Sequence, residues 1–229
     1  MVNGVILPLT NVVISARKED ETLFSKFMAL EEEKRERIMN AALSEFAQKG
    51  YKNASTNEIV IKANISKGLL FHYFNNKKSL FLFLIDYAET IFVDEFYKKF
   101  DMEETDIIKR FRQISMLKIE LIRKYPDLYR FLLSSMSEDS IEIKNEFDNR
   151  HINIIDEFYQ KLMMNLDTTN FKSGLSIQRV SEIIIWVMQG FANRELEKLR
   201  ANKNLDLNIN AIMANFDEYI DLLKNAFYK

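Results

Sequence analysis

The residues whose types and spacing most suggest a binding function lie between Lys49 and Lys78. This stretch holds six lysines and a single acidic residue, Glu58, so its local charge is +5 although the whole chain carries −2. Cations at this density pair well with phosphate groups, which dominate the affinity of proteins for nucleic acid. Charge alone is as compatible with a solvated basic face as with a nucleic-acid contact.

Two short helices are predicted within this basic stretch. Ser55 followed by Glu58 is a capping-box pattern, and it starts a helix that we expect to end near Asn64. Ser66 is a typical N-cap for a second helix, which should end near residues 75–76. Two short helices joined by about two residues are typical of a helix-turn-helix, whose second helix enters the major groove of DNA.

The second short helix has one apolar face. Leu70 and Phe74 stand at an i, i+4 spacing and are expected in the core. The other side chains then lie on outer or flanking faces as candidates for DNA contact: Lys67, Gly68, Leu69, Phe71, His72 and Tyr73. Aromatic groups around one lysine suit thymine methyl groups and phosphates. For His72 the alternative is an ordinary surface residue.

The stretch from Ser55 to Leu80, STNEIVIKANISKGLLFHYFNNKKSL, resembles the DNA-binding domain of the TetR/AcrR family of bacterial regulators. The residues that match the family pattern are Thr56, Ala63, Ile65, Ser66, Gly68, Leu70, Tyr73, Phe74, Lys77 and Leu80. The preceding helix is expected to run from about residue 30 to residue 49 and to end at Gly50, since glycine adopts the left-handed conformation of a helix end at little cost. It matches the family pattern at Ile38, Ala41, Ala42, Phe46, Gly50 and Tyr51. Asn64 replaces the usual turn glycine, Phe71 a frequent tyrosine and Lys78 a common glutamate.

The resemblance implies roles for individual residues. It implies DNA contacts for Thr56, Asn57, Ser66, Lys67, Gly68, Leu69, Phe71, His72, Tyr73 and Lys77. Within this set Thr56, Asn57, Tyr73 and Lys77 would bind phosphate, whereas Lys67 and Leu69 would approach bases. Lys62 is expected on a solvated face.

The composition predicts an all-α protein. Only five glycines and two prolines occur in 229 residues, which is few for a fold rich in tight turns. We expect an N-terminal extension over residues 1–29 and an N-terminal three-helix helix-turn-helix DNA-binding domain over 30–80. A larger C-terminal helical domain for ligand binding and dimerisation should follow over 81–229. Its helices are expected at 76–100, 106–124, 127–135, 141–166, 176–200 and 208–227.

Several classes of function lack support in the sequence. The chain has no cysteine, and its two histidines, His72 and His151, are far apart, so we expect no disulfide, metal or cofactor. No arrangement of catalytic residues is evident, and we expect no enzyme. No apolar run is long enough to span a membrane, and residues 1–16 lack the basic start of a signal peptide. We therefore expect a cytoplasmic protein.

The last two helices carry apolar stripes. The family resemblance implies that they pair across a two-fold axis, and the predicted dimer interface is Ile184, Val187, Phe191, Ile212, Phe216, Tyr219 and Leu223. Gly190 would permit close approach of helices. The alternative is that these stripes pack only within one subunit, because each helix needs one buried face in any case.

The middle of the chain is rich in aromatic residues and methionine. The resemblance implies an effector pocket, whose candidate lining is Phe92, Phe96, Phe111, Met116, Tyr125, Tyr129, Phe158, Met163 and Trp186. Each is more often an ordinary core residue than a ligand contact. Polar candidates are Arg112, Gln113, His151 and Gln189.

Together these observations predict a dimeric repressor that binds a palindromic operator in double-stranded DNA. A small apolar or amphipathic effector would release it by favouring a second conformation. The alternative is a ligand-independent DNA-binding or nucleoid-associated protein.

Overall fold

The computed structural model describes residues 24–136, 138, 140, 141, 143, 163–201 and 208–229. Its helices are α2 (Glu32–Asn53), α3 (Thr56–Ala63), α4 (Lys67–Phe74), α5 (Lys77–Tyr97), α6 (Ile107–Lys124), α7 (Pro126–Ser135), α9 (Ile177–Ala201) and α10 (Ile209–Phe227). The all-α prediction is confirmed. Most of the helix expected at 141–166 lies outside the described residues.

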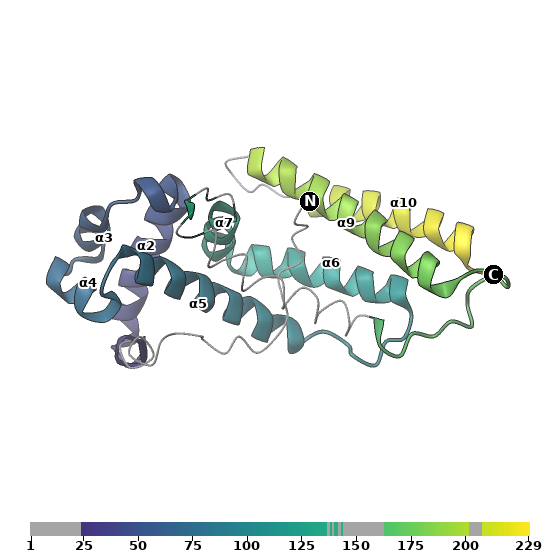
Figure 1. Cartoon of the computed structure of the whole chain (residues 1–229), viewed down its shortest axis with the longest axis horizontal. Helices are drawn as coiled ribbons and strands as arrows, with labels where there is room; N and C mark the ends of the chain where they lie inside the picture. Colours follow the sequence, from purple (N-terminus) through teal and green to yellow (C-terminus); the bar gives the residue numbers. More distant parts are fainter. Residues whose placement is uncertain (1–23, 137, 139, 142, 144–162, 202–207) are drawn as a thin grey trace.

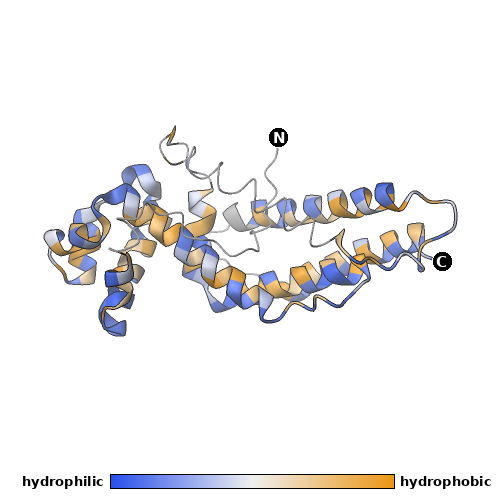
Figure 2. Ribbon diagram, turned by 60° about the horizontal axis from the view of Figure 1, so that its bottom comes forward, coloured by the Kyte–Doolittle hydropathy of each residue, from blue (hydrophilic) through white to orange (hydrophobic). Residues whose placement is uncertain are grey.

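The helices form a head and a longer body (Figure 1). We call residues 24–74 the head and the described residues from 107 onward the body, with α5 leading from one to the other. Figure 2 shows that the helices carry hydrophobic residues mainly on the sides that face their neighbours. In the body, α9 and α10 run side by side along α6. The helix α4 lies at the far end of the head.

Three side-chain caps set the starts of consecutive helices. Ser55 Oγ accepts the Glu58 N–H at 3.4 Å, and Ser66 Oγ accepts the Leu69 N–H at 3.2 Å. Asn76 Oδ1 accepts the Ser79 N–H at 2.9 Å. These caps confirm the predicted helix starts, because each satisfies a backbone donor that the first turn leaves without a helical partner.

The turn between α3 and α4 has the left-handed residue expected of it. Asn64 adopts φ 52° and ψ 53°, a region that asparagine tolerates better than most non-glycine residues. The substitution of asparagine for the usual turn glycine therefore leaves the turn intact. The angle between the two helices is thus set locally, within a few residues.

The first head helix continues past its predicted end. We expected Gly50 to end the helix, but α2 runs to Asn53 with a kink at Gly50, where φ is 68° and ψ is 172°. The positive φ was anticipated because glycine adopts it at little cost. The renewed helical turn after it was not, since it depends on contacts made by other parts of the chain.

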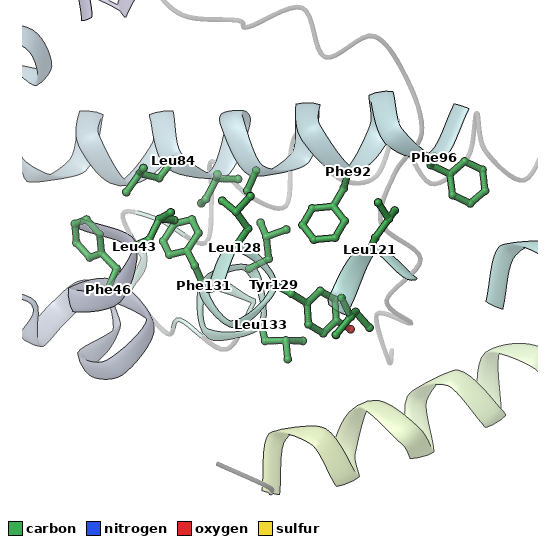
Figure 3. Close-up of a cluster of buried hydrophobic side chains, with 14 of the residues drawn as sticks. Leu43, Phe46, Leu84, Phe92, Phe96, Leu121, Leu128, Tyr129, Phe131 and Leu133 are labelled. Atoms are coloured by element: carbon green, nitrogen blue, oxygen red, sulfur yellow. The ribbon is translucent and has the colours of Figure 1, made fainter. Parts of the chain in front are cut away.

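A buried aromatic cluster joins the head to the body. The ring centroids of Phe46 and Phe81 lie 4.9 Å apart, and those of Phe81 and Phe131 lie 5.3 Å apart. These residues come from α2, α5 and α7, and Figure 3 shows Phe46 and Phe131 on the side of α5 that carries Leu84. Apolar burial of this kind is the main stabilising contribution to a helical interface.

The head also includes residues from the predicted extension. Residues 24–28 form a helical turn, and Phe27 is completely buried. Its ring centroid lies 4.7 Å from that of Phe74 in α4 and 5.5 Å from that of Phe83 in α5. The boundary that we placed at residue 29 thus separates Phe27 from the core it fills. Five helical residues are too few for periodicity to reveal this packing.

We expect Phe27→Ala to lower the free energy of unfolding by about 3 kcal/mol, because it leaves a cavity behind α4. Urea unfolding followed by circular dichroism measures the loss. Met28→Ala is the matched control, since Met28 is 38% exposed. Equal stabilities for the two variants would contradict the assignment of Phe27 to the core.

Candidate nucleic-acid interface

The exposed side of α4 carries part of the predicted DNA-contact set. Leu70 and Phe74 are each 1% exposed, so the predicted core face of this helix is the observed one. Of the predicted contact residues, Ser66, Lys67, Gly68 and His72 are exposed, whereas Leu69, Phe71 and Tyr73 are half-buried. At the start of α3, Asn57 is exposed and Thr56 is half-buried.

Aromatic contacts hold the polar groups of α4 in place. Lys67 Nζ lies 5.8 Å from the centroid of the Phe71 ring, within range of a cation–π interaction. The rings of His72 and Tyr73 are 5.2 Å apart, and Tyr73 in turn contacts buried Phe27 at 5.6 Å. Tyr73 is therefore a partly buried anchor of the helix as well as a candidate phosphate contact.

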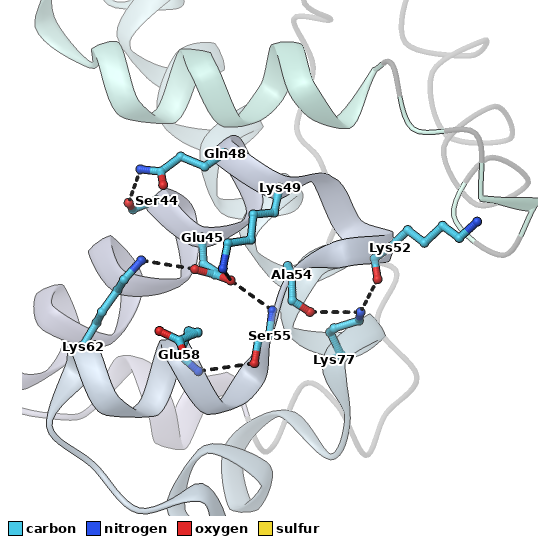
Figure 4. Close-up of polar contacts among 10 residues, drawn as sticks. All are labelled: Ser44, Glu45, Gln48, Lys49, Lys52, Ala54, Ser55, Glu58, Lys62 and Lys77. Atoms are coloured by element: carbon cyan, nitrogen blue, oxygen red, sulfur yellow. Dashed lines mark hydrogen bonds and ion pairs between the residues drawn. The ribbon is translucent and has the colours of Figure 1, made fainter.

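Lys77 has partners inside the protein. Its Nζ donates to the carbonyl oxygens of Lys52 and Ala54, both at 3.2 Å (Figure 4). It also lies 4.8 Å from the centroid of the Tyr51 ring. These contacts tie the start of α5 to the end of α2. These contacts explain the position of Lys77 without any contact to DNA. A substitution of Lys77 would therefore also disturb the packing of the head.

Sequence reasoning missed the central polar group of the head, Glu45. This residue of α2 is completely buried, and its Oε1 accepts the Ser55 N–H at 3.1 Å. Lys49 Nζ lies 2.7 Å from the same oxygen, and Lys62 Nζ donates to Oε2 at 3.1 Å (Figure 4). One carboxylate thus joins α2 to both ends of α3.

These contacts add to one expectation and correct another. Lys62 is exposed, as expected of a cation on a solvated face, but it also forms an ion pair with Glu45. In the predicted capping box, the Ser55 N–H would bond to the Glu58 side chain, but it donates to Glu45 instead. Glu45 lies four residues before Lys49, which was a weak signal, because that spacing is also typical of exposed ion pairs.

The surroundings of Glu45 keep it charged. Burial by itself raises the pKa of its carboxyl group, but hydrogen bonds from Lys49, from the Ser55 N–H and from Lys62 lower it. The net result is a pKa below the ordinary glutamate value. A buried carboxylate is stable only when its oxygens are satisfied in this way.

The predicted pocket residues do not gather around one cavity. Phe92, Phe96, Phe111 and Tyr129 are buried, and Tyr125 and Met163 are half-buried. Met116 and Trp186 are 48% and 64% exposed, so they do not belong to an enclosed interior. Phe158 and His151 lie outside the described residues.

An open groove of about 900 Å³ runs along α6, next to the end of α5 and the start of α10. Its charged and polar lining consists of Lys99, Glu104, Lys109, Arg112, Gln113, Glu120, Arg123 and Lys124. Its apolar lining consists of Met116, Leu117, Ile119, Ile209 and Met213. Met116 is the one member of the predicted pocket lining in it, and it is joined by the polar candidates Arg112 and Gln113.

The predicted dimer stripe holds α9 and α10 together within one subunit. Ile184, Phe191, Phe216 and Leu223 are buried, and Val187, Ile212 and Tyr219 are half-buried. The ring centroids of Phe191 and Phe216 lie 5.3 Å apart. The buried members of the stripe are therefore not offered to a partner. Other large apolar side chains are exposed on these helices: Ile183 at 38% and Trp186 at 64% on α9, and Leu222 at 65% on α10.

The head matches a known family of DNA-binding proteins. Residues 38–84, which run from α2 into α5, match the sequence profile described as "Bacterial regulatory proteins, tetR family". Residues 38–84 thus match the DNA-binding domain of that family. The helix-turn-helix of this domain is the pair α3 and α4, as the sequence resemblance predicted.

Individual relatives extend the similarity over more of the regulator. The HTH-type transcriptional regulator QacR of Staphylococcus aureus is 22% identical over 182 residues, which cover 76% of this chain and 96% of QacR. The HTH-type regulator YuxN of Bacillus subtilis is 44% identical over 55 residues, but these cover 24% of this chain and 19% of YuxN.

Solved structures share the fold of this chain. A TetR family transcriptional regulator from Chloroflexus aurantiacus superposes with a TM-score of 0.60 at 20% identity, covering 90% of this chain and 98% of that one.

Among the residues that the structure describes, no group of histidine, cysteine and carboxylate side chains could hold a metal ion. None of the helices in the described part is long and apolar enough to cross a membrane.

We expect Glu45→Gln to lower the free energy of unfolding at neutral pH by about 1–3 kcal/mol, because it removes the buried charged acceptor shared by the Ser55 N–H and two lysine ammonium groups. Since the folded-state pKa of Glu45 is lowered, its contribution is present above the ordinary value of about 4.3 and is lost as pH falls through the lowered pKa. The gap between variant and parent should therefore shrink in acid. Urea unfolding over a pH series measures it.

Glu58→Gln is the matched control, because Glu58 is an exposed carboxylate in the same three-helix unit. We expect it to change stability by at most about 0.5 kcal/mol. A gap for Glu45→Gln that is absent at neutral pH, or that stays constant down to acid pH, would contradict the account of this carboxylate.

Proposed function

We propose that this transcriptional regulator is a repressor that binds a palindromic operator as a homodimer and is released by a small apolar or amphipathic effector. The observation that carries the proposal is the exposed, cationic start of α4 at the far end of a tightly packed three-helix head. A recognition helix needs both features, because it must enter the major groove at a fixed angle.

The proposed DNA surface combines the starts of α3 and α4. Lys67 and His72 are exposed there, and a Cβ atom on Gly68 would meet nothing within 4 Å, so the backbone can approach DNA closely. Lys67 would contact bases or phosphate, and Thr56 and Asn57 would offer their hydroxyl, amide and backbone N–H groups to phosphate. Tyr73 would assist from its partly buried position, and Lys77 would act mainly by holding the head together.

One head buries too little area for tight specific binding, so two copies should act together. The exposed apolar side chains of Ile183, Trp186 and Leu222 support a dimer contact through α9 and α10. This contact would use a face of the two helices other than the predicted stripe. Gly190 lies on the same helix with open space around its Cα, which favours close helix approach. Two heads would then read half-sites about 34–36 Å apart, which is one turn of DNA.

The groove along α6 supports effector binding. Its lining combines apolar side chains with cationic and acidic ones, which suits an amphipathic molecule. Two proteins of similar fold have been solved with small molecules: FadR of Bacillus subtilis in complex with stearoyl-CoA, and SmeT with triclosan. An effector of this regulator would stabilise the protein and release DNA, because it must favour a conformation that binds DNA less well.

Repression is favoured over activation by the relative IcaR of Staphylococcus epidermidis, which is named a negative transcriptional regulator. It is 22% identical over 140 residues, covering 60% of this chain and 75% of IcaR. The competing function is ligand-independent or nucleoid-associated DNA binding. The groove along α6 favours the effector-responsive function over this alternative, because it offers a place for an amphipathic molecule to bind.

Selection of binding sites from random DNA at two salt concentrations tests the proposal. A recovered palindrome supports dimeric, specific reading, and fusion of that operator to a promoter then reports repression. Smooth binding without sequence preference at both salt concentrations would favour the nucleoid-associated alternative.

We expect Lys67→Ala to weaken binding to the selected operator by about tenfold and to reduce the salt dependence of binding if the lysine contacts phosphate. Fluorescence anisotropy over a salt series measures both quantities. Lys224→Ala is the matched control, because Lys224 is an exposed lysine on α10 in the body. Equal operator affinities for the two variants would contradict the proposal that α4 contacts DNA.

We expect Trp186→Ala to raise the dissociation constant of the dimer by about thirtyfold, which corresponds to about 2 kcal/mol for a central tryptophan. Sedimentation equilibrium measures the change. Met102→Ala serves as the control, because Met102 is 48% exposed outside α9 and α10. A dimer unaffected by Trp186→Ala would place the two-fold contact on another surface.

A further inference from the structure

A carboxylate from the body contacts the kink of α2. The Tyr51 N–H donates to Glu138 Oε2 at 2.7 Å across 87 residues of sequence. Glu138 lies just beyond the end of α7, and α7 packs against α2. A second contact lies nearby, where the Ser134 hydroxyl donates to the Phe46 carbonyl oxygen at 3.4 Å. Head and body therefore meet through polar groups as well as through the aromatic cluster.

Gly50 has the backbone conformation and the free space that this carboxylate contact needs. Its φ of 68° lies in the region that side chains with a Cβ rarely adopt, and it redirects the backbone just before Tyr51. A Cβ atom at this position would lie 3.2 Å from Glu138 Oε2, closer than an ordinary contact. Both the conformation and the close approach of Glu138 require glycine. The residue thus does more than interrupt a helix.

The second carboxylate oxygen binds the chain that follows α7. Glu138 Oε1 accepts the Ser140 N–H at 3.2 Å, and the Ser140 carbonyl oxygen accepts the N–H of Ile143 at 3.0 Å. Ile143 is completely buried. One side chain therefore links the head, through Tyr51, to a part of the body that is anchored in the core.

We propose that Glu138 is a positioning residue that fixes the angle of the DNA-binding head relative to the body. The inference rests on the proposed function, since the head angle matters only if the head reads DNA. When both oxygens are bonded, the kink of α2 cannot turn without breaking a charge-assisted hydrogen bond. A body conformation that displaces Glu138 from Tyr51 would release the head, which gives an effector a route to the DNA surface.

The size of the effect follows from the chemistry of the contact. Loss of a hydrogen bond to a charged group changes an equilibrium constant by about tenfold to hundredfold. Glu138→Gln keeps the side-chain volume but leaves a single acceptor oxygen for two N–H donors. Glu138→Ala removes both acceptors. We therefore expect head mobility to increase from the parent to the glutamine variant and again to the alanine variant.

The distance between head and body tests the proposal directly. The chain has no cysteine, so spin labels can be attached at Asn40→Cys on α2 and Ser173→Cys in the body, both exposed positions. Double electron–electron resonance on the full chain, diluted with unlabelled protein, gives the distance distribution without DNA. The parent should show one narrow distribution, and Glu138→Gln and Glu138→Ala should broaden or shift it progressively.

Asp127→Asn is the matched control, because Asp127 is an exposed carboxylate of α7 whose recorded partner, Arg130, lies on the same helix. A distribution that is unchanged in both Glu138 variants overturns the proposal, and so does an equal change in the control. If Glu138→Ala fails to fold, the glutamine variant decides. Operator affinity in the same variants should fall by about tenfold for Glu138→Ala. Failure of every form, including the parent, to bind DNA would refute the proposed function and leave the distance result standing.

Discussion

The DNA-binding head depends on one buried carboxylate. Glu45 is the only side chain in the described head that joins α2 to the start and to the last turn of α3 by ionic or charge-assisted contacts. The short turn at Asn64 then fixes α4 relative to α3. A chain of local constraints thus runs from α2 to the recognition helix. Because a buried charge costs several kcal/mol when its partners are lost, this arrangement favours one geometry strongly over others.

Aromatic packing also stabilises the positions of the head helices, in addition to the contacts of Glu45. Phe27 fills the space behind α4 and contacts α5 as well, so the recognition helix is supported from within. Phe46, Phe81 and Phe131 connect the same head to α7. The head is therefore not an independent module on a passive support. It packs against α7, so α7 contributes to holding its position.

Features of this fold that depend on neighbouring residues could be predicted from the sequence. Features that depend on contacts between residues far apart in the sequence could not. The caps at Ser66 and Asn76 and the left-handed turn at Asn64 follow from residue types and spacings of three or four. Phe27 and Glu45 act through partners many residues away, which a single sequence does not reveal. Periodicity placed an apolar stripe on α9 and α10, but it could not tell that Ile184 and Phe216 face each other's helices within one subunit.

The central claim is that the starts of α3 and α4 form the surface that binds DNA. Amide hydrogen exchange of the full chain, with and without its selected operator, tests this claim most directly. The account predicts slower exchange concentrated in residues 55–72 and little change along the groove of α6. Slower exchange confined to the body, with residues 55–72 unaffected by saturating operator, would contradict it.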